Sequence, residues 1–337
     1  MIGNLLGIIK YKEQPSYRKF CQEVIMKIGI IGAGAVAAAC TISTILRGCA
    51  REIVIVSRTR SRANAVATDM RYGSPLSPAV DVRDGDYEDL KGAAVVLITA
   101  GVNEKSGGAI DRNDPAGRLK LLDANIKVYG DIVPNIVKYA PGAVIVVVTD
   151  PPDPLADMAR QMAGHNRVLS TGTYLDSLRF RVHLAQKLSV SAASVEALVV
   201  GEHGTSQVFL WSSARARSVP YCNLLEECRM TPEAFRAEIE KEVRFANITI
   251  IEGNNASQYG IGMVCARITE IILRDEQAVI PIGTYNPVYG VTLSLPGVLG
   301  RDGVSRILEP DMSEDERAAL QLSADKIKNA LAGRLAG

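Results

Sequence analysis

The chain has 337 residues, of which 47% are hydrophobic and 5% aromatic, and its formal net charge is +1. This length can bury one large core or two linked ones, whereas the near-neutral charge argues against nucleic acid as a partner. The six cysteines form no C-x-x-C pair and lie away from the three histidines, which argues against a disulfide framework and a metal site. No apolar run reaches the roughly 18 residues of a membrane helix, so a cytoplasmic protein without a membrane partner is expected.

The first 25 residues fit no later element, and an arm, a leader and an upstream start all stay open as explanations of this tail. From residue 26 onward, apolar strands alternate with helical patterns. Strands are expected at 24–31, 53–56, 93–99 and 143–149. Because these strands are apolar on both faces, they indicate a parallel sheet covered by helices. Residues 26–172 are therefore predicted to form a Rossmann-type, doubly wound α/β domain.

After Pro151 the pattern changes to longer helices and shorter strands. Amphipathic helices are expected near 174–188, 232–251, 255–274 and 313–332, and strands near 196–200, 277–283 and 291–299. The last helix begins with a capping box formed by Ser313 and Glu316. Residues 173–337 are therefore predicted to be a mixed α+β substrate domain.

A glycine-rich turn joins the first strand to the first helix, with the sequence Gly32-Ala33-Gly34-Ala35-Val36-Ala37. In this G-x-G-x-x-A pattern the first glycine permits the tight turn, and the second lets a pyrophosphate approach the backbone. A small residue at the last position lets the helix pack on the sheet. The placement between a strand and a helix predicts a dinucleotide site that includes Gly32, Gly34, Ala35 and Val36.

The end of the second strand is where a carboxylate usually accepts hydrogen bonds from the ribose 2′-hydroxyl, and here it holds Ser57. Three arginines follow, at 58, 60 and 62. A serine hydroxyl with Arg58 and Arg60 nearby can bind a 2′-phosphate, which a carboxylate would repel. NADP(H) is therefore predicted as the preferred cofactor, with NAD(H) still possible. The alternative is that these arginines are solvated surface charges.

A histidine lies between two glycines in Gly201-Glu202-His203-Gly204, directly after an apolar strand. Histidine can transfer a proton near neutral pH, although a structural role is the simpler interpretation of this motif alone. Asp176 and Arg179 lie three residues apart and so share one helix face. One can orient a histidine and the other can bind a carboxylate. His165 and His183 have no such partner pattern and are read as structural.

Taken together, these motifs resemble the L-lactate and malate dehydrogenase family from about Lys27 to Leu331. The matching stretches are IGIIGAGAVA at 28–37, TAGVN at 99–103, GRLKLLDANI at 117–126, GTYLDSLRFR at 172–181, VGEHG at 200–204 and SQYGIGM at 257–263. The resemblance implies reversible hydride transfer between a nicotinamide cofactor and a 2-oxo acid, giving an (S)-2-hydroxy acid. It also implies a homodimer or homotetramer.

The resemblance further implies residue roles. His203 matches the proton donor and acceptor, with Asp176 as its orienting carboxylate. Arg179 matches the arginine that pairs with the substrate carboxylate, and Arg118 matches the loop arginine that polarises the carbonyl. Additional matches place Ser257 at the pocket wall and Thr99, Ala100 and Gly101 beside the cofactor.

Departures from the family pattern concern the substrate. The segment between Asn103 and Arg118 is several residues longer than usual, and Glu104 stands at the usual selectivity position. An acid there would repel a second carboxylate, whereas Arg112 inside the insertion could bind one. A substrate wider than lactate and a dicarboxylate bound by Arg112 are both open, as is a solvated loop.

Asp150 ends a strand where the family usually has asparagine, and Thr205 replaces a common aspartate. An ionised Asp150 can only accept hydrogen bonds, so it could contact cofactor hydroxyls or favour a substrate with a positive amine or imine.

The sequence thus predicts an NAD(P)-dependent 2-hydroxyacid dehydrogenase, with NADPH preferred and a substrate wider than pyruvate. One alternative is a malate dehydrogenase acting on oxaloacetate. A second alternative, from another class, is a dinucleotide-binding sensor without turnover.

Overall fold

One nine-stranded sheet forms the centre of the protein, in a computed structural model that describes residues 26–114, 116–228 and 230–334. Its strand order is β14-β13-β12-β6-β5-β4-β1-β2-β3. In that order the strands span Gly303–Ile307, Val291–Gly300, Ala278–Asn286, Val168–Ser170, Val144–Val147, Val95–Ile98, Lys27–Ile31, Glu52–Val56 and Asp81–Gly85. The six strands from β6 to β3 are mutually parallel and have the Rossmann order. The predicted doubly wound sheet is confirmed.

Helices cover both faces of this sheet. The bounds of the first helices are Ala35–Arg47 for α2, Arg60–Gly73 for α3, Leu122–Tyr139 for α4 and Pro152–Ala163 for α5. Side chains of α2, α3 and α8 (Tyr259–Arg274) share one apolar cluster with one face of the parallel strands, and those of α4 and α5 share another with the opposite face. Both faces of the central strands are therefore buried, which explains their uniformly apolar sequences.

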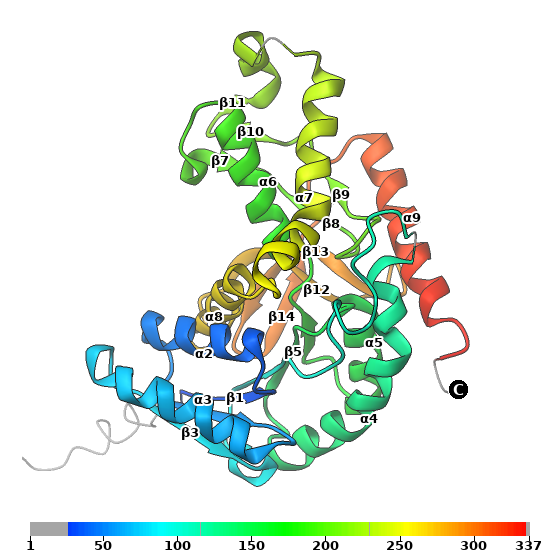
Figure 1. The fold of residues 1–337 in the computed structure, drawn as a ribbon. Coiled ribbons are helices and arrows are strands. Elements are labelled where there is room, and N and C mark those ends of the chain that lie inside the picture. Colours follow the sequence, from blue (N-terminus) through cyan, green and yellow to red (C-terminus); the bar gives the residue numbers. More distant parts are fainter. Residues whose placement is uncertain (1–25, 115, 229, 335–337) are drawn as a thin grey trace, which may run out of the picture.

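The second half of the chain adds an antiparallel extension and a separate helical layer. β12, β13 and β14 are antiparallel to one another and join the parallel strands where Gly283 pairs with Ser170. The remaining helices are α6 (Tyr174–Lys187), α7 (Pro232–Asn254) and α9 (Glu314–Leu331). Five short strands complete this half: β7 (Val195–Glu196), β8 (Val199–Val200), β9 (Val208–Phe209), β10 (Arg215–Ala216) and β11 (Val219–Pro220). In Figure 1, α6 and α7 project above the end of the sheet together with most of these short strands.

Several sequence expectations differ from the structure in detail. The strand expected at 196–200 is divided into β7 and β8, and the helix expected from 255 begins at Tyr259. The first strand was expected from residue 24, which lies outside the described residues, as does the whole N-terminal tail. The capping box of α9 is confirmed, because Ser313 Oγ accepts from the Glu316 N–H at 3.2 Å and the Glu316 carboxylate accepts from the Ser313 N–H at 2.8 Å.

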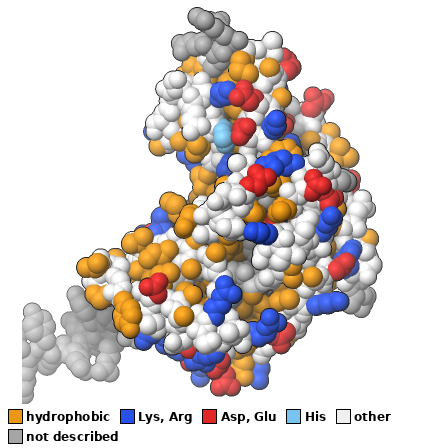
Figure 2. Space-filling model, viewed as in Figure 1, with side chains coloured by type: hydrophobic (Ala, Val, Ile, Leu, Met, Phe, Trp, Pro, Cys, Tyr) orange, Lys and Arg blue, Asp and Glu red, His pale blue; other side chains and the backbone are white. Residues whose placement is uncertain are grey.

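One outer side of the molecule carries exposed apolar side chains. Figure 2 shows them gathered where α2, α3 and α8 lie. The exposed members on α2 and α8, here called the α2–α8 patch, are Ile42, Leu46, Tyr259 and Met263. Among the described residues, no helix is both long enough and apolar enough to cross a bilayer.

Candidate active site

A pocket opens between the carboxyl ends of the parallel strands and the second half of the chain. Its wall contains many of the residues singled out from the sequence: Val36, Thr99, Gly101, Glu104, Arg118, Asp150, Arg179, His203 and Ser257. Residues from seven separate stretches of the chain thus meet at the edge of the sheet where ligands bind in open α/β folds.

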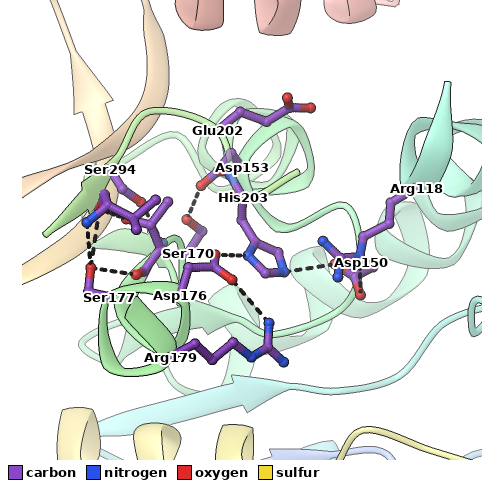
Figure 3. Close-up of polar contacts among 12 residues, drawn as sticks. Arg118, Asp150, Asp153, Ser170, Asp176, Ser177, Arg179, Glu202, His203 and Ser294 are labelled. Atoms are coloured by element: carbon purple, nitrogen blue, oxygen red, sulfur yellow. Dashed lines mark hydrogen bonds and ion pairs between the residues drawn. The ribbon is translucent and has the colours of Figure 1, made fainter. Parts of the chain in front are cut away.

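Asp176 lies behind the pocket wall and joins His203 to Arg179 (Figure 3). One carboxylate oxygen contacts His203 Nδ1, and the other accepts a hydrogen bond from Arg179 at 3.0 Å. Burial would raise the pKa of Asp176, but the adjacent His203 and Arg179 lower it to about 2. An ionised Asp176 therefore accepts a hydrogen bond from the Nδ1–H of His203, and Nε2, the opposite ring nitrogen, is directed toward the pocket.

The loop that carries His203 is fixed by contacts from distant elements. Gly201 exchanges two backbone hydrogen bonds with Ser294 of β13, at 2.9 and 3.0 Å. The φ of Gly201 is +84°, and a Cβ there would lie 2.6 Å from Ser323 Oγ, so only glycine fits this turn. The same Ser323 hydroxyl accepts from the Glu202 N–H at 2.9 Å. β13 and α9 therefore place the histidine at the end of β8.

Asp153 is a second buried carboxylate that holds His203, and the sequence analysis did not identify it. It accepts a hydrogen bond from the His203 backbone N–H at 2.6 Å and another from the Ser170 hydroxyl. Burial raises its pKa to about 6, even though both hydrogen bonds oppose the shift. In the run Asp-Pro-Pro-Asp-Pro, no sequence signal shows that this residue meets a loop 50 positions further along the chain.

Two more carboxyl groups, those of Glu104 and Asp150, line the same pocket as Arg179. Asp150 lies 3.4 Å from Arg118 Nε and 3.8 Å from His203 Nε2. The Glu104 side chain is in hydrogen-bonding contact with Asp150, and burial followed by the charge of Asp150 raises the pKa of Glu104 to about 7. Burial lowers the pKa of Arg118, but Asp150 and Glu104 more than compensate and raise it. Arg118 is therefore a charged guanidinium held between two acids.

Asn125 of α4 fixes the backbone on both sides of this carboxyl pair. It is fully buried. Its amide donates to the Asp150 carbonyl at 2.7 Å, and its side-chain oxygen accepts from the Val102 N–H at the same distance. The chain that carries Glu104 and the strand end that carries Asp150 are therefore tied to one helix.

The glycine-rich turn has the form that a dinucleotide requires. Gly32 has φ +122° and donates to the Val56 carbonyl at 2.8 Å, and a Cβ at Gly32 would lie 2.5 Å from Thr99 Oγ1. Gly34 has open space where a side chain would stand, and no side chain caps the first turn of α2. Unpaired N–H groups at a helix N-terminus attract phosphate. The residues at this turn therefore fit the pyrophosphate of a nicotinamide cofactor.

The arginines after β2 differ in their surroundings. Ser57 follows Val56, so it lies directly beside the glycine-rich turn. Arg60 forms ion pairs with Asp84 and Asp86 at the end of β3. The guanidinium of Arg60 is therefore engaged by carboxylates. The cofactor contacts of Ser57 and Arg58 stay predictions.

Arg112 is not brought into the main pocket. Its guanidinium donates to Glu252 of α7 at 2.6 and 2.8 Å and to Thr249 Oγ1 at 3.2 Å. It lines a smaller cavity beyond Arg118 instead. Conversely, Asn247 of α7 lines both cavities but was not singled out, since one buried amide in an amphipathic helix gives no sequence signal.

Fold and site together are those of a nicotinamide-dependent dehydrogenase. Comparison with family models agrees. Residues 26–170 match the NAD binding domain of lactate/malate dehydrogenase, and residues 173–336 match its alpha/beta C-terminal domain.

Individual relatives show the same relation. An L-lactate dehydrogenase of Thermus aquaticus is 43% identical over 314 residues, which cover 90% of this chain and 98% of that relative. One of Chloroherpeton thalassium is 42% identical over 91% of this chain and 99% of the relative. The solved minor L-lactate dehydrogenase of Enterococcus mundtii superposes with a TM-score of 0.84 at 31% identity, covering 93% of this chain and all of that one. The chain belongs to the lactate/malate dehydrogenase family.

Proposed function

We propose that the protein interconverts a 2-oxo acid and an (S)-2-hydroxy acid, with NADPH as the preferred reductant and a substrate wider than pyruvate. The observation that carries this proposal is the convergence of His203, its carboxylate Asp176, and two arginines on one pocket beside the glycine-rich turn. Membership of an NAD(P)-dependent dehydrogenase family supports the enzyme over the sensor alternative. A binder without turnover has no physical need for an acid-base group and its orienting acid.

Each side chain has a distinct task in this reaction. Arg179 binds the substrate carboxylate through two parallel hydrogen bonds. Arg118 then donates to the substrate carbonyl, which polarises it and stabilises the charge that develops on oxygen. The bound nicotinamide cofactor supplies or accepts the hydride.

Proton transfer belongs to His203. During reduction its Nε2–H gives a proton to the developing alkoxide, and during oxidation the same nitrogen removes it. Asp176, held ionised by the shift of its pKa to about 2, stabilises the imidazolium that must form in one of these directions. Because Asp176 is buried, this stabilisation is only weakly screened by solvent.

NADP(H) preference is the finer part of the proposal, and it is supported by the chemistry next to the turn. Ser57 replaces a carboxylate that would repel a 2′-phosphate, and Arg58 follows it. The first turn of α3 contains two arginines and no acid, an arrangement that is unfavourable at a helix N-terminus unless an anion is bound. Arg60 is already paired, so we assign the principal phosphate contacts to Ser57 and Arg58.

The malate alternative has less support. It requires a cation for the second carboxylate of oxaloacetate, and Arg112 is engaged with Glu252 outside the pocket. Inside the pocket, Glu104 and Asp150 would repel that second carboxylate. We therefore favour 2-oxo acids with a single carboxylate.

The test is a matrix of initial rates for NADPH and NADH with pyruvate, oxaloacetate, phenylpyruvate and branched 2-oxo acids. We expect turnover with monocarboxylic 2-oxo acids larger than pyruvate and little with oxaloacetate. His203→Asn should abolish turnover while cofactor affinity, measured by fluorescence titration, is retained. His183→Asn is the matched control, because that histidine does not line the pocket. If the parent protein binds the cofactor but turns over no 2-oxo acid, the result would support the alternative of a dinucleotide-binding sensor.

Cofactor choice needs its own variant. Ser57→Asp combined with Arg58→Ala removes the proposed phosphate contacts and restores a ribose acceptor. Since charged hydrogen bonds contribute roughly 1.5–3 kcal/mol, the ratio of kcat/KM for NADPH over NADH should fall by at least about tenfold. An unchanged ratio would refute the assignment.

Two further parts of the proposal concern the whole chain. We assign residues 26–172 to the cofactor and 173–337 to the substrate. We also propose that two copies associate through the α2–α8 patch to form a homodimer, from which a tetramer could be built. The support is the exposure of Leu46 and Met263, at 68% and 65%, on neighbouring helices.

A further inference from the structure

The pocket contains more negative charge than the proposed reaction needs. In that reaction Asp176 orients His203, and Arg179 binds the substrate carboxylate. Glu104 and Asp150 have no corresponding task, yet both line the pocket and contact each other. Placing two carboxyl groups side by side in a partly buried site is unfavourable unless a proton or a cation compensates them.

Arg118 alone does not provide that compensation. It is one guanidinium facing two acids, 3.4 Å from Asp150 at Nε, and it must also turn its donors to the substrate carbonyl. When a substrate carboxylate enters and pairs with Arg179, the negative charge in the pocket increases further. Near neutral pH a proton on Glu104 can relieve the repulsion between the two acids, and a cationic ligand can take the place of that proton.

Local structure holds Glu104 in place rather than leaving it on a solvated loop. The Asn103 side chain accepts from the Ser106 N–H at 2.9 Å, and the Asn103 carbonyl accepts from the Gly107 N–H at 2.9 Å. The Glu104 carbonyl accepts from the Ala109 N–H at 2.8 Å. With Asn125 bonded to the Val102 N–H, these turns direct the Glu104 carboxyl into the pocket beside Asp150.

We propose that Glu104 and Asp150 form a subsite for a cationic, hydrogen-bond-donating group, an ammonium or guanidinium, on the side chain of the 2-oxo acid substrate. This inference rests on the proposed function and names its substrate class. Ionised carboxylates only accept hydrogen bonds, so the pair matches the donors of such a group. An apolar side chain would bring no donor or positive charge to either acid, and an acidic one would be repelled.

The test compares three 2-oxo acids of similar length that differ in terminal charge: 2-oxo-5-guanidinopentanoate, 2-oxoheptanoate and 2-oxoadipate. Initial rates with the preferred cofactor give kcat/KM for each. We expect the guanidino substrate to exceed the neutral one by about tenfold or more, the effect of one charge-assisted hydrogen bond, and the dicarboxylate to be the poorest.

Glu104→Gln retains the shape of the side chain and removes its charge. The ratio of kcat/KM for the guanidino substrate over 2-oxoadipate should fall by at least about tenfold in this variant. Glu242→Gln makes the same chemical change on an exposed position of α7 that lines neither cavity, and it should leave the ratio unchanged.

The outcomes separate the two proposals. Turnover of neutral 2-oxo acids without a preference for the guanidino substrate would overturn the cationic subsite and leave the proposed reaction intact. An equal loss on all three substrates in Glu104→Gln would also overturn it, because the residue would then act on the reaction rather than on the side chain. Failure of every 2-oxo acid would overturn the proposed reaction and the subsite together.

Discussion

His203 is held by two buried carboxylates that act on different parts of the residue. Asp176 contacts the ring at Nδ1, and Asp153 accepts from the backbone N–H. Their pKa values move in opposite directions, to about 2 for Asp176 and about 6 for Asp153, because positive partners surround the first while burial dominates at the second. One acid is therefore ionised throughout the neutral range, and the other titrates just below it.

Replacing Asp176 should affect chemistry more than binding. Asp176→Asn can still accept from Nδ1, so the ring orientation is retained, but the charge that stabilises the imidazolium is lost. We expect kcat to fall by about a hundredfold or more, the usual contribution of acid-base catalysis, with the reduction profile moved to lower pH. Steady-state rates across pH measure both effects. An unchanged pH profile would show that the carboxylate has only a structural role.

The raised pKa of Asp153 predicts a pH-dependent contribution to the free energy of unfolding. The folded pKa of about 6 lies above the ordinary aspartate value of 3.8, so the folded protein binds this proton more tightly than the unfolded chain does. The stability that the protonated carboxyl contributes is fully present below pH 3.8 and is lost as the pH rises to about 6. That loss is on the order of 3 kcal/mol.

Asp153→Asn removes this titration. The free energy of unfolding of the variant, relative to the parent protein, should therefore rise between pH 4 and pH 7. Chemical denaturation at several pH values measures the difference. A difference that stays constant over this range would mean that the carboxyl titrates alike in the folded and unfolded states.

At the scale of elements, the long loop after β4 is docked on α7. Arg112 reaches Glu252 and Thr249 there, and Lys105 donates to Asn255 at 2.8 Å just beyond the helix. Glu104 and Arg118 lie toward the two ends of this loop, so docking keeps both side chains at the pocket. Residues of the insertion thus anchor the loop on the second half of the chain.

This docking predicts how Arg112→Gln behaves. Exposed ion pairs contribute little, so kcat/KM should fall only slightly, and by the same factor for pyruvate and oxaloacetate. A fall in kcat/KM for oxaloacetate alone would instead mean that Arg112 binds the second carboxylate of this substrate. Parallel initial rates with both substrates decide between these roles. Arg217→Gln, an exposed arginine outside both cavities, is the control.

Elements were predictable from sequence where hydrophobic pattern determines them. β1, β2, β4 and β5 are continuous apolar runs, and each was expected close to its observed position. β3 was not predicted, because Asp81–Gly85 is polar and pairs only along one edge with β2. The docking of the long loop on α7 was also not predicted, since it depends on contacts between residues about 140 positions apart. Motifs pointed to His203, Arg118 and Arg179, which the structure brings to one pocket wall, whereas the contacts of Asp153 and the pairing of Arg60 arise only from folding.

At the scale of the whole molecule, the glycine-rich turn and the pocket are connected through one helix pair. α2 begins at the glycine-rich turn, and α8 begins beside Ser257 and contributes Ile261 to the pocket wall. The two helices pack together over the same face of the sheet, and a Cβ at Gly262 would lie 2.6 Å from the Ala39 backbone. Their outer faces carry the α2–α8 patch, so association through this patch would support both binding sites.

Leu46→Glu combined with Met263→Glu should therefore convert a dimer to monomers. Charges placed in an apolar interface cannot be solvated there, whereas in the monomer they stand on an exposed surface. Light scattering coupled to size-exclusion chromatography measures the mass, and kcat should fall with it because the α2 and α8 termini lose their support. Leu322→Glu is the matched control, since Leu322 is 69% exposed on α9, away from the patch. A parent protein that is already monomeric, or a dimer that survives the double substitution, would show that this surface does not hold two copies together.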